Sequence, residues 1–301
     1  MYMKKRLFGL ALVLALCLTL LSVSALAADE PYNLWVNNIQ VTDANAADVL
    51  GNADEGATVC YDAESNTLTL NGAVLDKAYD TGVIYAKGTG MLTINVVGDS
   101  QITAAGDNVN GIYLGTVSTT ENPSPQYSLL LTGSAKLDID VTGSGSAVSA
   151  TTDITVEKLT LEAEVTDANG GNVFFAGGKT IIKDKASLDL YAANYTAIYG
   201  EDGVEISGGT VTVEAPNSNP IYSSDGNVII SGSANVTATG HNGIVGSNVA
   251  ISDNAKVDTT STDDCGIFTA GTVTISGNAD VTANGHYAAL RGDTKVEITG
   301  G

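Results

Sequence analysis

The sequence is poor in basic side chains. Its 301 residues include 13 Lys and Arg against 34 Asp and Glu, and three of the basic residues, Lys4, Lys5 and Arg6, stand near the N-terminus. Without these three the net charge is 10 − 34 = −24, and Arg291 is the only arginine left. A surface of this charge repels phosphate backbones and anionic lipids. We therefore expect no nucleic-acid partner and no membrane-surface partner, and a polyanionic ligand would need bridging cations.

Cysteine and long apolar runs are also scarce. Cys60 and Cys265 are the only cysteines beyond the N-terminal segment, and the roughly 200 residues between them predict two free thiols rather than a disulfide framework. One long apolar run, "LFGLALVLALCLTLLSVSALA", follows the basic residues and ends in the small residues Ala25 and Ala27, as at a signal-peptidase site. This run predicts a secretory signal over residues 1–27, and no later run is long enough to span a bilayer.

Helical periodicity is absent after residue 27, where apolar residues alternate as they do in strands. The alternating segments recur at a nearly constant spacing, with steps of 24, 37, 25, 26, 24, 24, 21, 24 and 23 residues. The long step holds the insertion "TVSTTENPSPQYS". The aligned strand starts are Leu68, Leu92, Leu129, Ile154, Thr180, Val204, Val228, Val249, Val273 and Val296.

Each repeat contains two alternating segments and a short third one, with Gly, Asn, Asp and Ser at the corners. Three strands in one such repeat make one coil of a single-stranded parallel β-helix, a solenoid. We predict an all-β fold of about nine coils over residues 68–301, preceded by an N-terminal β cap over 28–67 that shields the first edge. A β-sandwich also has short alternating strands, but it does not explain the constant register. The last segment, "VEITGG", starts another coil, so we expect the repeat to continue beyond Gly301.

The alternation predicts which residues fill the core. Aromatic residues make up only 6% of the chain, which suits a narrow core of aliphatic columns. The second strands are predicted to point Leu137, Leu161, Leu188, Val211, Val236, Val257 and Val281 inward. The third strands are predicted to point Val148, Val173, Ile198, Ile221, Ile244 and Ile267 inward.

The residue that follows each third-strand core position is then predicted to face solvent. This outward column contains Val245 and the aromatic residues Tyr113, Phe174, Tyr199, Tyr222 and Phe268, with Tyr85 approximately in register. Sugar rings stack their C–H faces on exposed aromatic rings, so the column predicts a glycan-binding face. Cross-strand packing of the rings, which stabilises a sheet without any ligand, is the alternative.

Two further sets of residues are candidate metal ligands. Asp202 and Asp225 lie at acidic corners of neighbouring coils, where carboxylate oxygens suit Ca²⁺, although Asp is also an ordinary corner residue. His241, Asp264 and His286 fall at one predicted position in three successive coils. Such a column can bind a transition metal or transfer protons, and chance occupancy of a solvated loop is the alternative. The acidic corners thus make calcium the candidate cofactor.

The cap carries a resemblance to a known family. It lies in the segment "LWVNNIQVTDANAADVLG", followed by "YDAESNTLTLNGAVL" and then by Gly-rich coils. This order resembles secreted and cell-surface proteins of Gram-positive bacteria, many of them described as carbohydrate-binding-domain-containing proteins. In that motif Gly commonly stands where this chain has Asn38. The resemblance implies a parallel β-helix, an extracellular location, and binding of acidic plant polysaccharide with calcium.

A second, looser resemblance concerns catalysis. "TDDCGIF" followed by "NGHYAALRG" looks like a degraded polygalacturonase signature, with Asp263, Asp264, Gly285 and His286 at suitable spacing. However, Tyr287 replaces the second Gly of the expected Gly-His-Gly. Adjacent carboxylates on a strand also point to opposite faces, whereas glycoside hydrolysis needs a positioned pair. We therefore expect no catalytic residues.

Together these patterns predict a non-catalytic, extracellular carbohydrate-binding protein whose partner is a polysaccharide. One alternative is a structural or adhesive stalk on the cell surface, attached to the wall through a further C-terminal module. The other is a pectin-active hydrolase or lyase.

Overall fold

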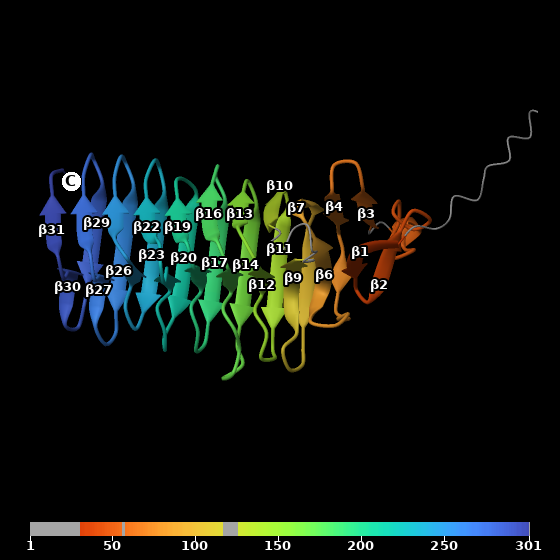
Figure 1. Cartoon of the computed structure of the whole chain (residues 1–301), viewed down its shortest axis with the longest axis horizontal. Helices are drawn as coiled ribbons and strands as arrows, with labels where there is room; N and C mark the ends of the chain where they lie inside the picture. The colour runs from red at the N-terminus through yellow and green to blue at the C-terminus, as the bar shows by residue number, and fades with distance from the viewer. Residues whose placement is uncertain (1–30, 56–57, 117–125, 301) are drawn as a thin grey trace, which may run out of the picture.

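The computed structural model describes residues 31–55, 58–116 and 126–300. The protein is an all-β parallel solenoid of about nine turns, as predicted. Figure 1 shows a straight rod in which strands of successive coils lie side by side along the long axis. The predicted signal over residues 1–27 and most of the insertion after Thr116 lie outside the described residues.

Three sheets run along the rod, and each complete coil contributes one strand to each of them. Sheet A contains, in spatial order, β2 (Ile39–Thr42), β1 (Pro31–Val36), β6 (Gly82–Gly88), β9 (Asn110–Thr116), β12 (Val148–Ala150), β15 (Phe174–Ala176), β18 (Ile198–Gly200), β21 (Ile221–Tyr222), β24 (Ile244–Gly246), β27 (Cys265–Thr269) and β30 (Ala288–Gly292). Sheet B contains β3 (Thr58–Asp62), β4 (Thr67–Asn71), β7 (Gly90–Gly98), β10 (Tyr127–Gly133), β13 (Ile154–Glu157), β16 (Lys179–Lys183), β19 (Gly203–Ile206), β22 (Asn227–Ile230), β25 (Val249–Ile251), β28 (Thr272–Ile275) and β31 (Lys295–Ile298). Sheet C contains β29 (Asp280–Asn284), β26 (Lys256–Ser261), β23 (Asn235–Gly240), β20 (Thr210–Ala215), β17 (Ser187–Ala192), β14 (Thr160–Val165), β11 (Lys136–Val141), β8 (Ser100–Ala104) and β5 (Val74–Leu75).

The helical content of the described residues is one short 3-10 turn, η1 (Ala53–Glu55). None of the described residues belongs to a helix of the length and apolarity that crossing a membrane requires.

The strand pairing confirms the predicted repeat. In sheet B each predicted strand start from Leu92 to Val296 pairs with the next one. The first start differs, because Leu68 pairs with Ile94 and therefore lies two residues out of the predicted register. The predicted inward column of sheet C is confirmed from Leu137 to Val281.

Aliphatic side chains of successive coils stack in the core. Leu137, Val211 and Val236 are all less than 1% exposed, and full burial of such a side chain stabilises the fold by roughly 1.5–3 kcal/mol. Thr180 occupies a core position as well, and its hydroxyl donates to the backbone oxygen of Tyr199 at 2.8 Å, so no polar group is left unsatisfied there. Each coil covers its neighbour, which makes the stability a sum of local coil-to-coil contacts.

The predicted third-strand column is wrong at one position. Val148 pairs with Phe174 rather than with Val173, and Phe174 pairs in turn with Ile198. Phe174 is fully buried, whereas Phe175 faces solvent and is 38% exposed. Val173 is itself buried at the corner, so apolar character did not distinguish the two registers. A slip of one residue exchanges the two faces of a strand, which is why the prediction placed Phe174 outside.

Antiparallel hairpins close the N-terminal end of sheets A and B. β1 pairs with β2, and β3 pairs with β4 around a turn that contains Asn66. Asn37 and Asn38 connect β1 to β2 with φ values of 52° and 64°, the left-handed conformation that a two-residue hairpin turn requires. Asn and Gly are the residues that adopt it most readily, which explains how Asn38 stands where the resembled motif has Gly. The division between cap and coils at residues 67 and 68 stays a prediction.

Polar side chains join the corners of successive coils. The amide of Asn242 donates to Asn219 at 3.0 Å, and that of Asn248 donates to Asn227 at 2.9 Å. The side-chain oxygen of Asn242 also accepts from the backbone N–H of Cys265. These contacts satisfy backbone and amide groups that the tight corners would leave unpaired.

Candidate functional site

The outward residues at the centre of sheet A form one continuous column along the rod. Pairing places them in the order Trp35, Tyr85, Tyr113, Ser149, Phe175, Tyr199, Tyr222, Val245, Phe268 and Arg291, which we call the sheet A column. Of the predicted aromatic set, four residues belong to it. The fifth, Phe174, is replaced by Phe175 for the reason given above.

Three successive coils carry rings at the middle of this column, and of these Phe175 is exposed while Tyr199 and Tyr222 are half-buried. The rings of Phe175 and Tyr199 are stacked, with centroids 5.2 Å apart and planes 9° apart. The centroid of Tyr222 lies 5.7 Å from that of Tyr199, with the planes tilted by 55°. The Tyr199 hydroxyl is within hydrogen-bonding distance of the Ser224 hydroxyl, at 3.0 Å. The result is an apolar strip with hydroxyl groups along its side.

The N-terminal end of the column is packed rather than exposed. Trp35 stacks on Tyr79 at 4.4 Å, and both rings contact the edge of Tyr85. Tyr85 also stacks on Tyr113 at 5.5 Å and lies beneath the Lys87 ammonium, so it is only 2% exposed although it points outward. Burial raises the pKa of the Tyr85 hydroxyl. This cluster attaches the cap to the first coils, and Trp35, which lies in the cap, could not be assigned to it from the repeat.

The C-terminal end of the column carries a positive charge. The Arg291 guanidinium lies over the Phe268 ring, 5.1 Å from its centroid, and Arg291 Nε also bonds Asp293 Oδ1 at 2.9 Å. The hydrogen bond that Arg291 donates to Asp293 raises the pKa of Arg291. Within the described residues, the sheet A column therefore contains one charged member and no carboxylate.

Sheet C presents a strongly acidic surface that sequence analysis missed. Five carboxylates and Tyr191 line a shallow concavity of about 330 Å³, over strands β11, β14 and β17; the acidic residues are Asp138, Asp140, Glu162, Glu164 and Asp189. Like charges on neighbouring strands repel each other. The signal was present in the alternating segments "DID", "EAE" and "DLY", which occupy equivalent positions in three successive repeats.

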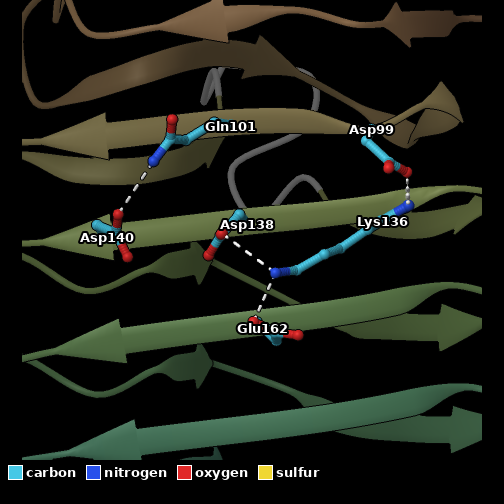
Figure 2. Close-up of polar contacts among 6 residues, drawn as sticks. All are labelled: Asp99, Gln101, Lys136, Asp138, Asp140 and Glu162. Atoms are coloured by element: carbon cyan, nitrogen blue, oxygen red, sulfur yellow. Dashed lines mark hydrogen bonds and ion pairs between the residues drawn. The ribbon is translucent and has the colours of Figure 1, made fainter.

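Lys136 lies between two of these carboxylates (Figure 2), and its positive charge reduces their repulsion. Its ammonium bonds Glu162 Oε2 at 2.5 Å and Asp138 Oδ2 at 3.3 Å, and its backbone N–H donates to Asp99 Oδ1 at 2.9 Å. Gln101 donates to Asp140 Oδ2 at 3.2 Å. The hydrogen bond to Glu162 raises the pKa of Lys136, because it stabilises the charged ammonium.

The residues predicted to bind calcium are not aligned as expected. Gly203 pairs with Asn227, so Asp202 stands opposite Gly226 rather than opposite Asp225. Asp225 stands beside Glu201. Asp202 and Asp225 are both exposed. No group of three or more His, Cys, Asp and Glu side chains in the described part of the chain is arranged to hold a metal ion.

The predicted His-Asp-His column is also one residue out of register. Cys265 pairs with Ala288, so Asp264 lies opposite Tyr287, whose backbone N–H donates to the Asp264 carbonyl at 2.8 Å. His286 therefore precedes the shared position. His241 does lie beside Asp264, but its Nδ1 contacts the amide of Asn242 at 3.2 Å.

Both predicted thiols are free. Cys265 is fully buried, and its thiol donates to Asp264 Oδ1 at 3.2 Å. Burial, reinforced by the neighbouring carboxylate, raises the pKa of Cys265 to about 11. A thiol in this environment is almost entirely protonated at neutral pH and is a poor nucleophile.

Comparison with known proteins found no matching family model, no similar curated protein and no similar solved structure. The two surfaces described above are therefore interpreted from their own chemistry.

Proposed function

We propose that the protein is a non-catalytic, extracellular polysaccharide-binding solenoid and that the sheet A column contacts the glycan. The observation that supports this most directly is the row Phe175, Tyr199 and Tyr222. These rings lie next to each other on three successive coils, with centroids 5.2 and 5.7 Å apart. Phe175 is exposed, Tyr199 and Tyr222 are half-buried, and the column has no carboxylate although the protein is acidic.

Sugar rings suit this strip for a physical reason. A pyranose has apolar C–H faces and a hydroxyl rim, so it loses little hydration when it lies against an aromatic surface. The carboxylates of sheet C disfavour a polyanionic glycan on that surface in the absence of a bridging cation.

A second candidate function is a structural or adhesive stalk. It is favoured by the stacking of Phe175 on Tyr199, because rings that cover each other stabilise adjacent coils without any ligand.

Affinity electrophoresis tests the proposal. The protein would migrate through gels that contain polygalacturonate, xylan or hydroxyethylcellulose, with and without calcium. We expect retardation in at least one gel, and we expect the double variant Tyr199→Ala/Tyr222→Ala to weaken it by about tenfold or more, since each ring contact contributes on the order of 1 kcal/mol. Tyr191→Ala, on sheet C, is the matched control and should bind normally.

Migration without retardation in every gel would support the stalk instead. Retardation that is unchanged in the double variant would show that binding occurs on another surface. New reducing or unsaturated ends in the same polysaccharides would indicate the pectin-active enzyme.

A further inference from the structure

The row of rings in the sheet A column is interrupted at Ser149 and at Val245, and Ser149 is the smaller and the only polar residue of the two. Ser149 on β12 stands between Tyr113 on β9 and Phe175 on β15, and it pairs directly with both. Tyr113 stacks on Tyr85, toward the N-terminus, and Phe175 stacks on Tyr199, toward the C-terminus. In the described residues neither ring has a ring partner on the Ser149 side. Two aromatic faces without a ring partner therefore lie on either side of a small residue.

The width of this interruption matches one inserted ring. Tyr113 and Phe175 are two strands apart, which corresponds to about 9.6 Å along the rod. A ring placed midway would lie about 4.8 Å from each of them, close to the 5.2 and 5.5 Å at which the existing rings stack. Ser149 is half-buried, and among the described residues its hydroxyl has no hydrogen-bond partner. That hydroxyl is free to bond a ligand.

We propose that Tyr113, Ser149 and Phe175 form a subsite that holds a single pyranose ring between the two aromatic rings. This proposal rests on the proposed glycan-binding function and assigns one position within it. Ser149 lies at the base and exchanges a hydrogen bond with a ring hydroxyl. The neighbouring positions of the column, Tyr113 and Phe175, carry no charge.

The sandwich also determines which sugars fit. Both faces of the ligand meet an aromatic ring, so both must consist of C–H groups. A pyranose with all its ring substituents equatorial, of the gluco or xylo type, meets this requirement. An axial hydroxyl, as in mannose or galactose, places an oxygen against one of the aromatic faces and loses its hydrogen bonds to water without compensation. The subsite therefore selects β-linked gluco- and xylo-configured chains.

Filling the interruption provides a direct test. Ser149→Tyr adds a ring that stacks on both neighbours, and we expect it to raise the melting temperature and to weaken cellohexaose and xylohexaose binding at least tenfold by isothermal titration calorimetry. Ser149→Ala keeps the space open but removes the hydroxyl, so it should weaken binding by about threefold, as expected for the loss of one neutral hydrogen bond and less than for Ser149→Tyr. The intact protein should also prefer cellohexaose to mannohexaose by at least tenfold, as expected for one unpaired polar group.

The outcomes separate this subsite from the wider function. If Ser149→Tyr binds cellohexaose as well as the unmodified protein does, the subsite is wrong, even where Tyr199→Ala/Tyr222→Ala still weakens polysaccharide binding. Equal affinity for cellohexaose and mannohexaose overturns the selectivity. If the unmodified protein binds none of the glycans, both proposals fall. Tyr113→Leu removes one of the two aromatic rings of the subsite and should weaken binding about fivefold. If Ser149→Tyr does not fold, Tyr113→Leu takes its place as the test.

Discussion

Truncation of Phe174 should destabilise the solenoid much more than truncation of Phe175, the next residue in β15. Phe174 is fully buried, so Phe174→Ala removes its transfer free energy and leaves a cavity, at a cost of about 3–5 kcal/mol. Phe175 is 38% exposed and stacks on Tyr199. Phe175→Ala removes only partial burial and one ring pair, at a cost of about 1–2 kcal/mol. We expect the two free energies of unfolding to differ by roughly 2–3 kcal/mol.

Urea unfolding followed by circular dichroism measures this difference, with both variants under identical conditions. Coil arrays can lose their cooperativity, so hydrogen exchange of peptides that cover β15 and β18 provides a local measurement beside the global one. The two residues have the same side chain and adjacent positions, and each serves as the control for the other. Equal costs, or a larger cost for Phe175→Ala, would show that the register of β15 described here is incorrect.

Three further predictions concern charge and ionisation. Lys136→Gln should lower the free energy of unfolding by up to about 1 kcal/mol, and the loss should be larger at low salt. The control is Lys256→Gln, which should change the free energy of unfolding little, because Lys256 holds the equivalent position of β26 and has no ion pair among the described residues. Equal effects of the two substitutions would count against the ion-pair explanation. Alkaline pH should destabilise the fold, because burial raises the pKa of Cys265 from 9.0 to about 11 and that of Tyr127 from 10.0 to about 12, so the unfolded chain releases these protons first. The stabilisation that these two groups contribute is present in full below pH 9 and is lost between about pH 9 and 12. Urea unfolding midpoints at pH 8, 10 and 11 measure this loss. In Cys265→Ala the midpoint should fall less over the lower part of this pH range. At pH 8 a thiol reagent should modify the half-buried Cys60 and leave Cys265 unmodified until the protein unfolds, and equal rates would contradict the burial of Cys265.

Much of the fold could be predicted because it is encoded locally. Alternation of side chains and the spacing of the corners act within a single coil, and the same pattern recurs along the chain. This is why the strand starts from Leu92 to Val296 and the core column from Leu137 to Val281 were correct. The candidate site was partly predictable for the same reason, since Tyr199 and Tyr222 each follow a core Ile in short, regular third strands.

What the sequence by itself determined is the repeat, its three strands and the existence of an outward aromatic column. Only the tertiary structure decided where the register changes at the corners, because corner length and backbone path are not periodic. One extra residue before β15 brought Phe175 rather than Phe174 to the outward position of that strand. One residue before β30 likewise moved His286 away from the position equivalent to Asp264. The structure also decided which residues become neighbours across coils, since stacking joins positions that are far apart in sequence. It thereby placed Trp35 over Tyr85, Lys136 between two carboxylates, and Ser149 between two rings.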